Sequence, residues 1–291
     1  MNAAPTVIPR KAPDFRLSDA DLPKYWLDGD AFKSRFFDAM QLLFPNGEKF
    51  FINCVRDYRD QVTDPLLQQQ AKDFTYQEGQ HAMAHMQFNE RLREQGVEVD
   101  RILDHQDHIE NEVFRKKFSK GFTLGMTAAG EHLTAIMCHG FFRAGVMDKA
   151  DARVRALYAW HAIEELEHKA VAFDVMTKVA KVSYLTRIAS FLFVSVMFPI
   201  HVFLIMGHML KVDGARNRLS LWLKGLWWLY GWNGLYPRIM GHYFSYFRPG
   251  FHPWQHDDTT LHAQWCQSYE RHNGDAIKAG NDVMAYALAA A

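Results

Sequence analysis

Two imidazoles and a carboxylate lie close together in the segment Trp160–His168, whose sequence is WHAIEELEH. If this segment is a helix that turns by about 100° per residue, then His161, Glu165 and His168 fall within one arc of roughly 60°. Neutral imidazoles and carboxylates are good ligands for first-row metals, and burying them is costly unless something compensates them. The segment therefore predicts either a metal site or a helix with a solvated charged face.

The first half of the chain repeats these ligand types in the same order. Glu-x-x-His occurs twice in the sequence, at Glu78–His81 and at Glu165–His168. Each pair is preceded by a glutamate among apolar residues of the preceding predicted helix, Glu48 in one case and Glu131 in the other. Two neighbouring cations need bridging carboxylates and one imidazole each, which this arrangement supplies inside a four-helix bundle. The duplication favours a dinuclear metal site over a solvated face.

Four long amphipathic helices must position these residues. Apolar periodicity, prolines and capping residues predict that they begin near Pro45, Pro65, Gly121 and Asp151. Small residues at 125–130 would let helices approach closely, and no segment before residue 181 alternates as a strand does. We therefore predict an all-α fold, with an irregular lead-in over residues 1–30 and a four-helix bundle over residues 31–181.

The composition excludes several classes of protein. The formal net charge of the 291 residues is zero, which argues against a nucleic-acid binder that neutralises phosphates. Cys54, Cys138 and Cys266 form no CxxC pattern and are typical of thiols in a reducing compartment. Residues 1–17 contain no apolar core of a secretory signal. We expect a cytoplasmic protein with no nucleic-acid partner.

The chain becomes strongly apolar after residue 181. Residues 188–210 are almost wholly apolar and, as a helix, long enough to cross a hydrocarbon layer of roughly 30 Å. Residues 219–247 are rich in Trp and Tyr with interspersed Lys and Arg, which suits a membrane interface. This pattern predicts that residues 182–250 form a C-terminal hydrophobic helical extension. Residues 188–247 of this extension are expected to associate with the inner membrane. The alternatives are a buried appendage of the bundle or the interface of a homodimer, and residues 251–291 are expected to be a solvated helix or loose tail.

The order of the ligands resembles that of the ferritin-like, carboxylate-bridged di-iron proteins. His161, four residues before Glu165, extends the resemblance to the three-histidine di-iron N-oxygenases that act on arylamines. The resemblance covers residues 40–180 and lies in ligand order and spacing. It implies a ferritin-like bundle that holds two iron ions, with Mn/Fe or Zn as alternatives. The seven ligands implied are Glu48, Glu78, His81, Glu131, His161, Glu165 and His168.

Three further residues are candidates for the surroundings of the ligands. His85 lies one turn beyond His81, where it could be a ligand or could support one. Glu164 and Asp174 could accept hydrogen bonds from ligand imidazoles, as carboxylates near metal sites commonly do, or could be surface charges.

Longer stretches of the chain resemble a bacterial family described as "predicted metal-dependent hydrolase". The stretches that carry this resemblance are FPNGEKFF (44–51), QEGQH (77–81), WHAIEELEHKAVAFD (160–174) and RPGFHPW (248–254). This resemblance implies a metal and leaves the reaction open.

We expect an O₂-dependent oxidoreductase that hydroxylates, desaturates or N-oxygenates a small or lipid-like substrate and draws electrons from a donor protein or reductant. The alternative is a two-metal hydrolase, in which a metal-bound hydroxide attacks an ester or phosphoester. A third hypothesis is a non-enzymatic protein that handles iron or acts as a membrane scaffold. The first hypothesis needs a redox metal, whereas the second needs only a pair of Lewis acids.

Overall fold

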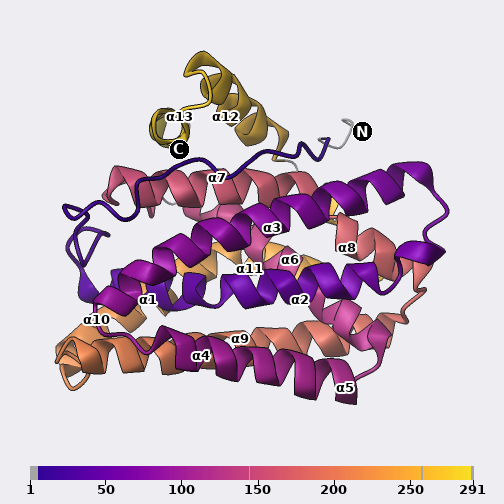
Figure 1. Ribbon diagram of the computed structural model, residues 1–291, viewed down its shortest axis with the longest axis horizontal. Helices are drawn as coiled ribbons and strands as arrows, with labels where there is room; N and C mark the ends of the chain where they lie inside the picture. Colours follow the sequence, from indigo (N-terminus) through magenta and orange to yellow (C-terminus); the bar gives the residue numbers. More distant parts are fainter. Residues whose placement is uncertain (1–5, 144, 257, 290–291) are drawn as a thin grey trace.

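The fold is all-α, as predicted. The computed structural model describes residues 6–143, 145–256 and 258–289, so the ends of the expected lead-in and tail lie outside the described residues. The structure is 73% helical, and its described residues form no strand, only an isolated bridge between Leu27 and Ala150. Figure 1 shows the helices running largely along the long axis of the molecule.

Four helices carry the predicted ligands and contact one another in a ring. They are α2 (Phe44–Arg56), α3 (Pro65–Glu94), α6 (Lys120–Arg143) and α7 (Ala152–His168). Helices α2 and α7 each pack against both α3 and α6. The predicted starts of α2, α3 and α7 are confirmed, since Pro45 lies in the first turn of α2 and the carboxylates of Asp64 and Asp151 cap the other two.

Glycines allow α6 to approach its neighbours closely. A Cβ atom added at Gly130 would collide with the ring of Phe51 on α2, and one added at Gly125 would collide with Ser190 on α9 (Tyr184–Val212). The small residues at 125–130 thus serve the close helix packing that the sequence predicts.

Shorter helices complete the bundle and brace it. They are α1 (Ala31–Leu42), η1 (Arg59–Gln61), α4 (Val99–Asp107), the π-helix η2 (His108–Phe114), α5 (Arg115–Lys117), α8 (Val171–Asp174) and the π-helix η3 (Val175–Val179). A buried ion pair ties α1 to the residue that follows α9, because Arg35 donates to both carboxylate oxygens of Asp213 at 2.7 and 2.9 Å. The sequence predicted one run over residues 151–181, but the structure divides it into α7, α8 and η3.

The hydrophobic region after residue 181 is helical. It comprises α9, α10 (Leu219–Tyr230) and α11 (Leu235–Ser245). By length and hydropathy alone α9 could cross a membrane, since it has 29 residues and a mean hydropathy of 2.3 over its most apolar window. Only 22% of that window is buried, and one side of α9 packs on α6 and α1. Its association with a membrane stays a prediction.

Both ends of the described chain pack against α7. The lead-in lies along α7 in Figure 1, with Phe15 and Trp26 buried. The C-terminal part consists of η4 (Pro253–Gln255), α12 (Thr259–Arg271) and α13 (Ala276–Ala289), and α12 and α13 both contact α7. A solvated helix or loose tail was expected over residues 251–291. The structure instead has two helices packed on α7, with Trp265 and Val283 buried.

Gly130→Ala should lower the free energy of unfolding by about 1–3 kcal/mol, because the new methyl group overpacks the contact between α6 and α2. The measurement is urea unfolding followed by circular dichroism. Gly207→Ala is the matched control, since a Cβ atom at this glycine inside α9 meets no atom within 4 Å. It should raise stability by about 0.5–1 kcal/mol; equal effects of the two changes would contradict the packing described here.

Candidate metal centre

The carboxylate of Glu165 lies at the centre of a buried cluster of imidazoles. Its Oε1 atom is 3.1 Å from His161 Nε2, 3.5 Å from His168 Nε2 and 3.6 Å from His81 Nδ1. Its Oε2 atom accepts a hydrogen bond of 2.6 Å from the hydroxyl of Thr134 on α6. The central oxygen therefore faces three imidazole nitrogens from two helices, while the other oxygen is held by a third helix.

The remaining predicted ligands surround this centre. His168 Nε2 lies 3.3 Å from Glu78 Oε1 and 3.4 Å from Glu131 Oε2. Donor atoms of Glu48, Glu78 and His81 also lie within 4.8 Å of one another, so Glu78 belongs to both groups. The structure thus brings all seven predicted ligands into one buried cluster.

Several buried polar atoms in this cluster have no hydrogen-bond partner. They are both carboxylate oxygens of Glu48, Glu78 and Glu131, together with His81 Nδ1 and His168 Nε2. Burying such atoms without a partner is costly, and native structures rarely do so without a reason. Cations in the cluster would satisfy them, so the residues fit a metal centre. A set of oxygen and imidazole ligands without thiolate suits iron or manganese, and imidazole also suits zinc.

A glutamine determines which nitrogen of His168 is free. Gln77 Nε2 donates to Glu167 Oε2 at 2.8 Å and to the carbonyl oxygen of Ile8 at 3.1 Å. The side-chain oxygen of Gln77 must then accept from His168 Nδ1, which lies 2.9 Å away. Nε2 of His168 is therefore the ring nitrogen that faces the three carboxylates and that a cation would bind.

The predicted role of Glu164 agrees with its position. Its Oε2 atom lies 3.2 Å from His81 Nε2, and a carboxylate there orients Nδ1 of the same ring toward the cluster. Burial raises the pKa of Glu164 to about 8, although the guanidinium of Arg10, 3.3 Å away, opposes this shift. A cation on His81 would strengthen the hydrogen bond from its ring to this carboxylate.

A chain of hydrogen bonds places His85 behind His161. The Asn89 amide donates to the carbonyl of Leu42 at 3.3 Å, so its oxygen accepts from Gln41 Nε2 at 3.0 Å. The oxygen of Gln41 then accepts from His85 Nδ1 at 3.2 Å, which leaves His85 Nε2 to accept from His161 Nδ1 at 2.6 Å. The lone pair of His161 Nε2 therefore points at Glu165. His85 Nε2 also lies 4.0 Å from Glu48 Oε1, and Glu48, His85 and His161 form a group that could hold a metal, so a purely supporting role of His85 stays a prediction.

Asp174 does not support the ligands as the sequence suggested. Its carboxylate binds His252 at 3.1 Å and Lys178 at 3.0 Å, at the end of the short helix α8. The break after α7 separates Asp174 from the helix that carries His161, Glu165 and His168.

Sequence reasoning missed the neutral side chains that hold the ligands. They are Gln41, Asn89, Gln77 and Thr134. Gln77 and Thr134 could have been noticed, since one precedes Glu78 directly and the other lies one turn after Glu131. Gln41 and Asn89 give no such signal, because their partners come from other helices.

The carboxylates of the cluster repel one another. Burial, and then the charges of the neighbouring glutamates, raise the pKa of Glu48 well above its ordinary value. The pKa of Glu131 is raised for the same reasons, whereas burial lowers the pKa of His81 well below its usual value. Glu165 is the exception, because the charge of His168 and hydrogen bonds from His161 and His168 outweigh burial and hold its pKa well below the ordinary value.

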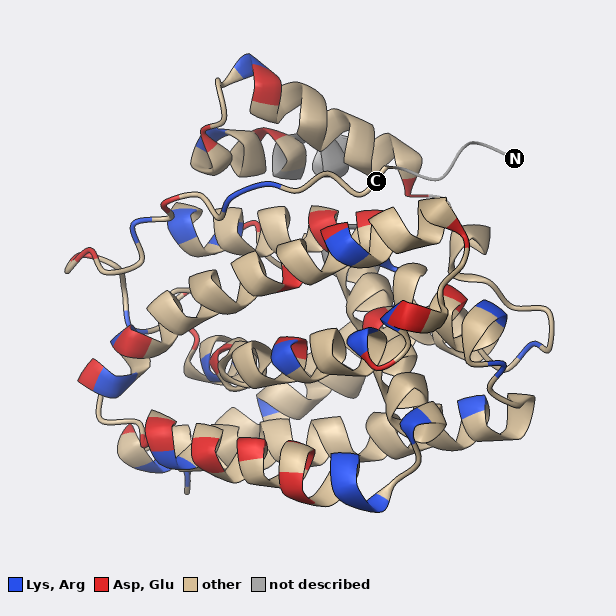
Figure 2. Ribbon diagram, turned by 45° about the vertical axis from the view of Figure 1, so that its right-hand side comes forward, with Lys and Arg blue, Asp and Glu red and all other residues tan. Residues whose placement is uncertain are grey.

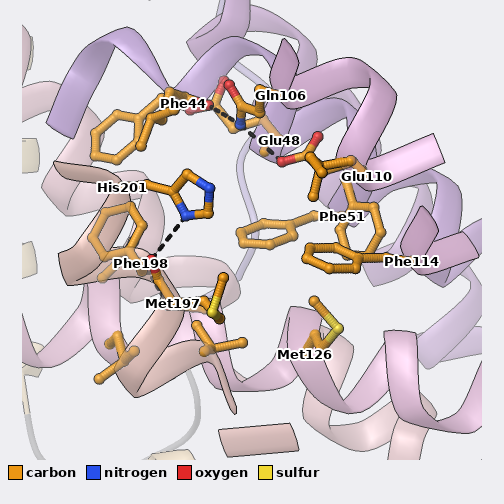
Figure 3. Close-up of a pocket in the computed structure, with 18 of the residues that line it drawn as sticks. Phe44, Glu48, Phe51, Gln106, Glu110, Phe114, Met126, Met197, Phe198 and His201 are labelled. Carbon is orange, nitrogen blue, oxygen red and sulfur yellow. Dashed lines mark hydrogen bonds between the residues drawn. The ribbon is translucent and has the colours of Figure 1, made fainter. Parts of the chain in front are cut away.

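An apolar cavity reaches the cluster from one side. It contains about 1050 Å³ of space outside protein atoms, part of it open to solvent, and its wall includes Glu48, His161 and Glu165. Figure 3 shows the rings of Phe51, Phe114 and Phe198 and the side chains of Met126 and Met197 around it. The wall contains no Lys or Arg among its described residues, and its polar side chains away from the cluster include Gln106, Glu110 and His201.

Residues 9–257 match the model of a family described as "predicted metal-dependent hydrolase". The chain belongs to this family. The matched region contains the whole cluster and the cavity wall, whereas α12 and α13 lie beyond it. Neither the curated proteins nor the solved structures give a match. The resemblance to ferritin-like and three-histidine di-iron proteins therefore stays a prediction, while membership of a metal-dependent family agrees with the buried cluster.

Glu165→Ala should abolish binding of two ions per chain, because it removes the oxygen that faces three imidazoles. His85→Ala should keep two ions and weaken their binding by about tenfold, as expected when a residue that supports a ligand is lost. The measurement is elemental analysis of the purified variants after loading and desalting. Equal loss of metal in both variants would refute the assignment of ligands.

Metal affinity should fall as pH is lowered. The raised pKa values of Glu48 and Glu131 mean that these groups bind protons in the metal-free fold, and a metal must displace those protons. Titration calorimetry with Mn²⁺ in buffers of different ionisation enthalpy should show net proton release. Binding that releases no protons, with affinity independent of pH, would contradict this picture of the cluster.

Proposed function

We propose that this protein is an enzyme whose cluster holds two iron ions and uses O₂ to oxidise an apolar substrate. The observation that carries the proposal is an apolar cavity that ends on ligand residues of the cluster, Glu48, His161 and Glu165. Such a cavity accommodates carbon-rich molecules and brings them to the cluster. Family membership supports the metal dependence, and the choice of reaction rests on the chemistry of the ligands and the cavity.

A reduced pair of irons would supply the capacity to bind and reduce O₂, with electrons from an external donor. The protein's own contribution is to orient ligands and exclude water. Thr134 fixes one oxygen of Glu165, and His85 fixes the ring of His161, on the side of the cluster that the cavity reaches. Phenylalanine and methionine side chains keep bulk water from the place where the substrate would react.

A two-metal hydrolase is the second candidate, and the description of the family favours it. The cavity lacks Lys and Arg among the described residues of its wall, so a phosphoester would find no positively charged side chain there besides the metal ions. A carboxylic ester with apolar arms fits the wall better. This candidate works with zinc and needs no O₂.

The two candidates can be separated by loading metal-free protein with ferrous ion or with zinc. We expect ferrous protein to consume O₂ in proportion to the iron bound, measured with an oxygen electrode, and zinc protein to hydrolyse no p-nitrophenyl acyl ester. Glu131→Ala is the control, since it removes a cluster carboxylate without changing the cavity wall. Zinc-dependent ester hydrolysis without O₂ uptake by the ferrous protein would overturn the oxidase and support the hydrolase.

A further inference from the structure

Helix α9 exposes a continuous apolar stripe to solvent. Leu192, Val196, Ile200 and Leu204 recur every four residues and are between 45% and 67% exposed. Val202, Met206 and Met209, on the opposite side of the helix, are buried in the bundle. Among the residues that the structure describes, packing covers one side of α9 and leaves the apolar stripe on the other side exposed.

Helix α10 and the turn after it continue this apolar surface. Leu219, Leu223, Trp227, Tyr230 and Trp232 are all exposed, Trp227 by 72%. The two helices lie on the same side of α1, because Phe36 of α1 contacts the ring of Phe203 on α9 and that of Trp228 on α10. We call the nine exposed residues of this paragraph and the one above the α9–α10 face.

The charges near this face are almost all positive. Residues 184–256 contain seven Lys or Arg and a single acid, Asp213, which is already bound by Arg35 and Lys24. Four exposed cations gather where α9 leads into α10: Lys211, Arg216, Arg218 and Lys224. Among the described residues no carboxylate forms an ion pair with any of these four. Figure 2 shows charged residues sparse on α9 and α10 and frequent on α4.

We propose that the α9–α10 face docks on the surface of a lipid bilayer that contains anionic lipids. Exposed leucines lie in the acyl region near the interface, tryptophans lie at the level of the headgroups, and the four cations contact lipid phosphates. Apolar side chains supply the attraction common to all bilayers, and the cations add a preference for anionic ones. The helix lies along the membrane surface, because its other side packs on α6 and α1.

The cavity favours a bilayer over a second copy of the chain as the occupant of this face. Half-exposed residues of the cavity wall come from η2 and α9. On α9, the wall residues Met197 and His201 directly follow Val196 and Ile200 of the exposed stripe. Consecutive residues of a helix are about 100° apart, so the mouth opens beside the stripe. A docked bilayer would supply apolar molecules to this mouth; this step alone rests on the proposed function.

The test is co-sedimentation of the full chain with vesicles of phosphatidylcholine, with and without phosphatidylglycerol. We expect binding to both, stronger with phosphatidylglycerol and weakened by salt. The double variant Leu204→Glu/Trp227→Glu should lower the partition coefficient at least about tenfold. The control Leu66→Glu/Met86→Glu adds the same charge at exposed sites on α3 and should change it less than about twofold.

Equal binding of the two double variants, or no binding of the unmodified chain to either vesicle, would overturn the proposal. Sedimentation velocity without lipid tests the second copy: a dimer that becomes monomeric only in Leu204→Glu/Trp227→Glu, without vesicle binding, would assign the face to self-association instead. Because vesicle binding involves neither metal nor turnover, its outcome is independent of the oxidase and hydrolase tests.

Discussion

Mutual repulsion between buried carboxylates is the constraint on which the rest of the structure depends. Glu48, Glu78, Glu131 and Glu165 converge from four helices into a space from which solvent is excluded. Like charges at this distance in a low dielectric oppose folding unless protons or cations neutralise them. The fold tolerates the arrangement because many apolar side chains of these helices are buried around the cluster. A bound cation would relieve the repulsion between these carboxylates, and this relief favours metal binding.

Neutral side chains fix the orientation of the ligands through hydrogen bonds and add no charge to the cluster. Gln77 and Gln41 use one end of their amides to accept from a histidine and the other to donate into the protein. Glu167 accepts a hydrogen bond from Gln77 and also binds Arg10 of the lead-in and His262 of α12, so it links Gln77 to both ends of the described chain. Arg10 and His262 therefore help to hold His168 through Glu167 and Gln77.

The sequence predicted those parts of the structure that local spacing determines. Glu78 and His81, or Glu165 and His168, must share a helix face once the segment is helical, and duplication of the pattern identifies the cluster. Contacts between distant segments are not encoded in spacing, so Gln41 behind His85 and the packing of α12 and α13 on α7 could not be predicted. Asp174 shows where prediction from helical spacing fails within residues 151–181. The break after α7 and the π-helix η3 change the register, so α-helical periodicity no longer gives the direction of each side chain.

The most direct test of the central claim is anomalous diffraction at the iron absorption edge from crystals of iron-loaded protein. The account predicts two peaks within the bundle, both bounded by Glu165. One should lie beside His168, Glu78 and Glu131, and the other beside His81, His161 and Glu48. A single peak, or an ion bound directly by His85, would contradict the account.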